Sequence, residues 1–149
     1  MKLTLQTDYS LRVILYIGAN EGARSTIHQI AIAYDISENH LTKIVHNLTT
    51  LGYLDSARGR HGGLKLPASL SSVRLGDFIS KLEPDFLQSP WFEEPVVKVS
   101  GLRQALIDAQ EAFVQSLNRY DVGQLLAPKS KLRKTLNLSL EPGTVNLNQ

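Results

Sequence analysis

Apolar residues in the first third of the chain recur at the three- and four-residue spacing of helices. The pattern predicts a helix from about Thr7 to Asn20 and a shorter helix from Thr26 to Tyr34. Ser37 then caps a third helix, whose apolar positions are Leu41, Ile44, Val45, Leu48 and Leu51. Because only a tight turn separates the second helix from the third, the pair is typical of a helix-turn-helix.

The next segment loses the helical period. In YLDSARGRHGGLKLP, residues 53–67, two short apolar runs flank a glycine-containing turn, which predicts a β-hairpin. An amphipathic helix from Val73 to Glu83 follows, and Pro84 ends it. A hairpin placed directly behind a helix-turn-helix is the wing of a winged helix-turn-helix.

One apolar stripe dominates the second half of the chain. It recurs at helical spacing from Leu102 to Tyr120 and predicts a long helix, followed by a short one over Val122–Leu126. Without further information, the stripe is explained by an amphipathic helix that packs against the rest of its own domain. The preceding segment QSPWFEEPVVKVSGL, residues 88–102, does not have a helical pattern.

These elements predict a mainly α fold with a small β-hairpin: a winged helix-turn-helix plus a long helix, to which the family resemblance described below adds a role in dimerisation. The expected boundaries are a DNA-binding domain over residues 1–83, a loop over 84–101, and the long helix with its short successor over 102–126. The remainder, 127–149, is a basic and then polar tail, expected to be disordered from about Leu138.

Composition and charge narrow the function classes. The chain is 42% apolar and 20% charged, as in ordinary globular domains, and its net charge of +2 does not by itself indicate a nucleic-acid partner. There is no cysteine, which excludes disulfides, thiolate metal sites and cysteine nucleophiles. We expect a cytoplasmic protein without a membrane span, and no enzyme, because no nucleophile-elbow or metal-ligand spacing occurs.

Candidate DNA contacts gather on the third helix and the hairpin. The helix face opposite the apolar stripe carries side chains that donate hydrogen bonds to base edges or phosphates, and Glu38 can accept one from cytosine. The hairpin turn adds arginines that suit a narrow minor groove or a pair of phosphates. A solvated helix face and a flexible surface turn are the alternatives. The full candidate set is Thr26, His28, Ser37, Glu38, Asn39, His40, Lys43, Arg58, Arg60 and His61.

Several short motifs resemble those of the IscR/NsrR family of dimeric bacterial repressors. They are Thr7-Asp8-Tyr9 with Arg12, Leu51-Gly52-Tyr53, Ser56-x-Arg58-Gly59-x-x-Gly62-Gly63-x-x-Leu66, Gly76-Asp77 and Leu82-Glu83-Pro84. The resemblance covers about residues 1–126. It implies a homodimer built around the long helix, with a winged-helix domain at each end, that binds double-stranded DNA at a palindromic operator.

Many members of that family hold an iron–sulfur cluster on three cysteines in the loop before the long helix. The resemblance places Glu94 and Ser100 at the last two cysteine positions and the first near Ser89, while Asp8 stands where an acid of the other subunit completes the ligand set in the nitric-oxide-sensing branch. Asp8 is equally explained as a first-turn acid on the helix dipole. Such clusters need soft thiolates, so we expect no cofactor.

The leading interpretation is a DNA-binding transcriptional regulator, acting as a repressor, whose effector is unknown. A second is a metal- or small-molecule-responsive sensor that uses the carboxylates of Asp8 and Glu94 at the dimer interface. A third is an interaction module that kept the fold and lost DNA binding. The arginines of the wing, Arg58 and Arg60, speak against the third.

Overall fold

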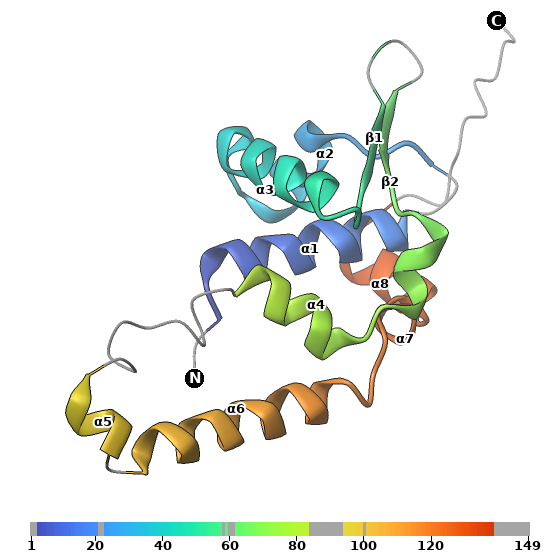
Figure 1. Ribbon diagram of the computed structural model, residues 1–149. Coiled ribbons are helices and arrows are strands. Elements are labelled where there is room, and N and C mark those ends of the chain that lie inside the picture. Colours follow the sequence, from blue (N-terminus) through green and yellow to red (C-terminus); the bar gives the residue numbers. More distant parts are fainter. Residues whose placement is uncertain are drawn as a thin grey trace, which may run out of the picture. The chain divides into compact units, whose positions relative to one another are not determined.

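A computed structural model of the chain describes residues 3–20, 23–57, 59, 62–83, 94–99 and 101–138 (Figure 1). Within these ranges the fold is mainly helical, and the one described sheet is a two-stranded hairpin. The chain divides into two compact units. The helix-turn-helix unit comprises Tyr9–Ala68 with Leu126–Gln149, and the long-helix unit comprises Met1–Asp8 with Ser69–Leu125.

The helix-turn-helix unit contains most of α1 (Leu5–Ala19), all of α2 (Ile27–Tyr34) and α3 (Glu38–Thr50), and the later α8 (Lys129–Thr135). Its interior is aliphatic, as the periodic pattern predicts. The buried residues include Val13, Ile17, Ile30, Leu41, Leu48, Leu54 and Leu64.

Polar caps fix the ends of α2 and α3, as expected from the sequence. The side chain of Thr26 accepts a hydrogen bond from the Gln29 backbone N–H, and the Gln29 side chain accepts one in return from the Thr26 N–H, which completes a capping box. Ser37 accepts from the His40 N–H in the same way. Between the two helices, Asp35 adopts a left-handed conformation with φ 53°, which makes the tight turn.

The predicted start of α1 is wrong by about one turn. The helix begins at Leu5, and Thr7 is buried within its first turn rather than capping it. Thr4 takes that role, because its hydroxyl accepts a hydrogen bond from the Thr7 N–H at 3.3 Å. Asp8 does lie in the first turn, where a carboxylate is favourable beside the helix dipole.

The hairpin pairs β1 (Asp55–Ala57) with β2 (Gly63–Lys65) in antiparallel register, with Ser56 opposite Leu64. Of these six residues only Leu64 is buried, so the hairpin projects mostly polar side chains. Its base is joined to the rest of the unit by the Leu64 N–H, which donates to the Ser25 carbonyl at 2.9 Å. The predicted wing is therefore present.

The long-helix unit packs α4 (Leu75–Leu82) against α6 (Leu102–Leu117), near the 3-10 turn η1 (Ala68–Ser72) and α7 (Val122–Leu126). The approach is close at Gly76, where an added Cβ would collide with the Val114 carbonyl oxygen. Two backbone hydrogen bonds, from Leu75 N–H to the Tyr120 carbonyl and from Val122 N–H to the Val73 carbonyl, are each 3.0 Å long.

Three details of the second half differ from the sequence-based expectation. The long helix ends at Leu117 rather than Tyr120, because Asn118 caps it and the chain then turns to pair with α4. A short helix, α5 (Pro95–Val99), precedes it in the segment expected to be irregular. The first part of the segment expected to be a basic tail forms a helix, α8. The expected disorder beyond about Leu138 concerns residues outside the described part of the chain.

Candidate nucleic-acid interface

Helix α3 has one buried face and one exposed polar face. Leu41, Ile44, Val45 and Leu48 are buried, and they fix the helix against the unit. The opposite face exposes four of the predicted DNA-contacting residues, Glu38, Asn39, His40 and Lys43, all in the first two turns. The structure therefore brings these four together at the end of the helix that a helix-turn-helix directs into the major groove.

Two of the predicted DNA-contacting residues serve as helix caps. Thr26 and Ser37 use their hydroxyls to accept backbone N–H groups of α2 and α3, as described above. The Thr26 hydroxyl also donates a hydrogen bond to Oε1 of Gln29 at 3.3 Å. Both side chains therefore fix the starts of their helices.

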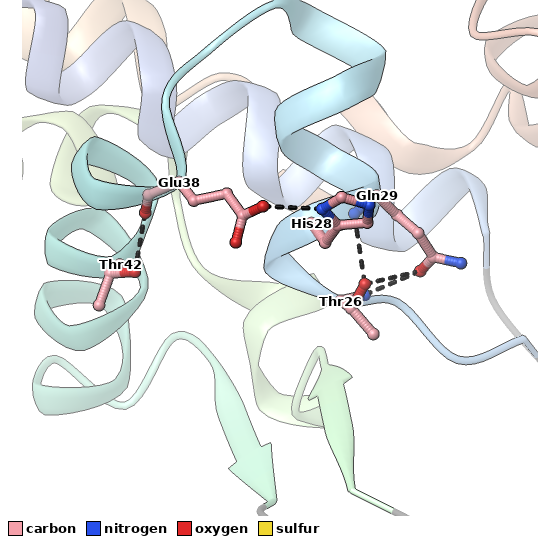
Figure 2. Close-up of polar contacts among 5 residues, drawn as sticks. All are labelled: Thr26, His28, Gln29, Glu38 and Thr42. Atoms are coloured by element: carbon pink, nitrogen blue, oxygen red, sulfur yellow. Dashed lines mark hydrogen bonds and ion pairs between the residues drawn. The ribbon is translucent and has the colours of Figure 1, made fainter.

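A hydrogen bond between two side chains joins the first turns of α2 and α3 (Figure 2). The Nδ1 atom of His28 lies 2.7 Å from Oε1 of Glu38, and the two side chains are 68% and 56% exposed. The Glu38 carbonyl also accepts a hydrogen bond from the Thr42 hydroxyl at 2.7 Å. The sequence predicts that His28 and Glu38 contact DNA. The structure places the two side chains beside each other, at the starts of α2 and α3.

Aromatic contacts from α1 and α2 support the same surface. The ring of Tyr9 lies against the ring of His40, with a centroid separation of 6.4 Å. The guanidinium of Arg12 lies 5.4 Å from the ring centroid of Tyr34, which contacts Tyr16 edge-on. Tyr9 and Arg12 belong to a motif of the family resemblance, and the contacts of Tyr9 with α3 and of Arg12 with α2 were not predicted from the sequence.

The wing has a brace that sequence reasoning missed. The Nη2 atom of Arg24 donates a hydrogen bond to the Gly59 carbonyl at 3.1 Å, across 35 positions of sequence. Its side chain crosses β2 at Gly63, where an added Cβ would lie only 2.8 Å from Arg24 Cγ. The remaining predicted wing contacts, Arg58, Arg60 and His61, lie outside the described residues.

Four residues stand where the family resemblance places the ligands of a cluster, and the structure describes two of them. Asp8 is half-buried in the first turn of α1, and Glu94 is exposed immediately before α5. Ser89 and Ser100 lie outside the described residues. Among the residues that are described, no group of three or more histidine, cysteine or acidic side chains is placed to hold a metal ion. The oxygen donors present do not match the thiolate donors that an iron–sulfur cluster needs.

Glu83, the residue before Pro84, is linked to the start of α1. Its Oε1 atom accepts hydrogen bonds from the Thr4 backbone N–H at 2.8 Å and from the Thr4 hydroxyl at 3.0 Å. Burial acts to raise the pKa of Glu83, but hydrogen bonds from Thr7 and Thr4 outweigh it, and the pKa lies below its usual value. The carboxylate is thus held in its charged form at the end of α4.

We compared this chain, with its helix-turn-helix and the hairpin that follows it, with known proteins. The sequence pattern of the Rrf2 family, described as an iron-dependent transcriptional regulator, matches residues 3–128. The chain belongs to the Rrf2 family. Among its relatives, the HTH-type transcriptional regulator NsrR of Bacillus subtilis (strain 168) is 37% identical over 144 residues, covering 93% of this chain and 99% of the relative.

A second relative and two solved structures are also similar to this chain. NsrR of Geobacillus kaustophilus (strain HTA426) is 38% identical, covering 91% of this chain and 97% of the relative. The oxidised form of Staphylococcus aureus CymR is 25% identical with a TM-score of 0.65, covering 85% and 96% of the two chains. IscR of T. potens, at 17% identity and a TM-score of 0.63, covers 96% and 94% and shares the fold.

Membership of the Rrf2 family establishes the coarse function. The relatives are transcriptional regulators that carry the helix-turn-helix in their names, so this Rrf2 protein is a DNA-binding regulator rather than an enzyme. Within the described residues no helix is long and apolar enough to cross a membrane.

Proposed function

We propose that the protein is a homodimeric repressor that binds a palindromic operator in double-stranded DNA and needs no iron–sulfur cluster to do so. The observation that carries the proposal is the polar end of α3, where four side chains with hydrogen-bonding groups are exposed above a buried aliphatic face. In this proposal Asn39 and Lys43 contact base edges, and His40 is oriented by Tyr9.

The residues around α3 position the protein on the DNA backbone. Phosphate contacts orient a DNA-binding protein without reading sequence, and hydroxyls and histidines serve this purpose. Thr26, His28 and Ser37 lie at the starts of α2 and α3, where we assign them this role. The wing carries Arg58, Arg60 and His61 to the neighbouring groove or phosphates, with Arg24 as the brace at its turn.

We propose a dimer because apolar residues of α6 are exposed to solvent in the single chain. Of its sixteen residues only Gln110 is buried, although the helix carries the longest apolar stripe of the chain. Leu102 and, just beyond the helix, Tyr120 remain 43% and 53% exposed. An apolar stripe left open in one chain is buried when two copies pack their long helices together. The two reading helices then meet two half-sites related by the same two-fold axis.

The absence of a cluster is proposed from donor chemistry. The sequence holds no cysteine, and the residues aligned with the family's ligands offer carboxylate and hydroxyl oxygens. Such hard donors do not hold the iron and sulfide of a cluster, which require thiolates. Anaerobic incubation with iron and sulfide is therefore expected to leave the protein colourless. A brown product with near-stoichiometric iron and sulfide would contradict this part of the proposal.

Selection of bound sequences from random duplex DNA tests sequence-specific DNA binding and dimer formation together. We expect an enriched palindrome, and a molecular mass in solution of two chains. The double variant Asn39→Ala with Lys43→Ala serves as control, because it removes the proposed base contacts without touching the buried face of α3. No enrichment with the natural protein would refute the proposal, as would an unaltered palindrome with the variant.

A further inference from the structure

Thr42 is an exposed residue of α3 that the predicted DNA contacts do not include. It lies three residues after Asn39 and four residues before His46, and all three side chains are exposed. Residues three and four apart are neighbours on the surface of a helix, with about 5–6 Å between their Cβ atoms. Thr42 therefore belongs to the same polar face of α3 as Asn39 and His46.

The hydroxyl of Thr42 is already used within the helix. It donates a hydrogen bond to the carbonyl of Glu38, four residues earlier, at 2.7 Å. A hydroxyl has one proton, so this bond leaves none to donate to a base or a phosphate. The bond also fixes the rotamer, because threonine carries its hydroxyl and its methyl group on the same β-carbon. With the hydroxyl turned back along α3, the methyl group points away from the Glu38 carbonyl (Figure 2).

The methyl group of Thr42 is thus an exposed apolar group among side chains that form hydrogen bonds. Asn39, Lys43 and His46 carry amide, ammonium and imidazole groups, which match the donors and acceptors of base edges. These groups do not recognise the C5-methyl group of thymine, which is the apolar feature of the major groove. The methyl group of threonine is among the side-chain groups that contact it. A methyl group held in one orientation near the N-terminal end of α3 fits this contact.

We propose that Thr42 recognises a thymine in each operator half-site, by apolar contact between its methyl group and the C5-methyl group of the base. The contact specifies the base at one position, because the other three bases present no methyl group there. The inference rests on the proposed function, since it requires α3 to enter the major groove. It adds to that function a specificity-determining residue that acts by apolar contact rather than by a hydrogen bond.

The test replaces each thymine of the selected palindrome in turn with deoxyuridine, symmetrically in both half-sites. Deoxyuridine lacks only the C5-methyl group, so base pairing and the hydrogen-bonding groups of the base edge are unchanged. Burial of one methyl-sized group corresponds to about a threefold to fourfold change in binding constant. We expect one thymine per half-site at which the substitution weakens binding of the full-length protein by about tenfold to fifteenfold over the two half-sites.

Two variants separate the methyl group of Thr42 from its hydroxyl. Thr42→Ser keeps the hydroxyl and lacks the methyl group, so it is expected to bind the thymine and deoxyuridine duplexes equally well. Thr42→Val keeps a methyl group and lacks the hydroxyl, so it is expected to retain the preference for thymine. Serine, threonine and valine have similar helix propensities, and the melting temperatures of both variants are expected to stay close to that of the natural protein.

Thr50 provides a matched control on the same helix. It is exposed, and its hydroxyl makes the same type of hydrogen bond, to the His46 carbonyl at 3.0 Å. It lies two turns beyond Thr42 and therefore about 12 Å farther from the N-terminal end of α3. Thr50→Ser is expected to retain the full preference for thymine.

A preference for thymine that Thr42→Ser abolishes, and that Thr42→Val and Thr50→Ser retain, supports the inference. It is overturned if no thymine is sensitive, if Thr42→Ser keeps the preference, or if Thr50→Ser also loses it. Loss of the preference in Thr42→Val overturns it as well, because the hydroxyl oxygen would then make the contact. In all these cases the proposed function stands as long as the natural protein binds the palindrome. Failure of the natural protein to select any palindrome would refute the proposed function, and this inference with it.

Discussion

Replacing Gly76 with alanine tests the close approach of α4 and α6. An added Cβ would collide with the Val114 carbonyl oxygen and lie 2.6 Å from Oδ1 of Asn118. The Asn118 side chain is already engaged, since it accepts from the Asp77 N–H at 3.1 Å and donates to the Asp77 carboxylate at 2.9 Å. A backbone carbonyl cannot rotate away, so the helices must separate.

Two opposing effects determine how much Gly76→Ala changes the free energy of unfolding. Alanine is favoured over glycine within a helix by about 1 kcal/mol. Overpacking typically costs about 1–3 kcal/mol, and a clash with backbone belongs near the upper end. We therefore expect Gly76→Ala to lower the free energy of unfolding by about 1–2 kcal/mol. For a chain of this size that corresponds to a fall of about 2–8 °C in melting temperature.

Thermal and denaturant unfolding measure this effect, and Gly18 provides the matched control. Gly18 is also buried within a helix, but an added Cβ there meets the end of the Leu126 side chain rather than backbone. Leu126→Ala is therefore expected to rescue Gly18→Ala, whereas Asn118→Ala leaves the Val114 carbonyl in place and is not expected to rescue Gly76→Ala. A Gly76→Ala protein that melts as high as the natural one would refute the described packing.

Three further predictions concern the reading surface and the start of α1. Arg24→Ala is expected to weaken operator binding about threefold to tenfold in a titration, since one hydrogen bond contributes about 1 kcal/mol; an effect no larger than that of Arg119→Ala would contradict the brace. Asn39→Ala is expected to change base preference by about 1–3 kcal/mol at one operator position, measured by competition between duplexes, and a uniform loss across all sequences would argue against base reading. Because hydrogen bonds lower the pKa of Glu83, its stabilising contribution is present above the ordinary value of 4.5 and is lost as pH falls through the lowered value. The stability difference between the natural protein and Glu83→Gln should therefore shrink on acidification, and a difference independent of pH in denaturant titrations would count against the link to Thr4.

Local signals in the sequence were sufficient for the helix-turn-helix. Helix α3 was predictable because its apolar residues repeat on one side only, and α2 because a capping box needs only Thr26 and Gln29 at the right spacing. The wing followed from its glycines and short apolar runs. The family membership that these motifs suggested is confirmed, as is the mainly helical fold with a hairpin.

Features that depend on distant contacts were not predictable in this way. Helix α8 has a single apolar residue, Leu132, and is held by the contact between Arg133 and Ala19 across 114 positions. The hydrogen bond from Arg24 to the Gly59 carbonyl has a backbone acceptor. Because every residue type has a backbone carbonyl, the sequence does not show which one accepts the bond. His28 and Glu38 are ten positions apart across a turn, so their pairing depends on the angle between two helices.

The composition of the helix-turn-helix unit has a consequence for the order in which the protein acquires its structure. The unit draws on Tyr9–Ala68 and on the segment from Leu126 onward, with Ser69–Leu125 of the long-helix unit between them. A ribosome therefore releases the first segment long before the second exists. Gly18 and the carbonyl of Ala19 stay uncovered until Leu126 and Arg133 have been synthesised. An expression fragment cut before Leu126 would keep the reading helix but leave that end of α1 bare.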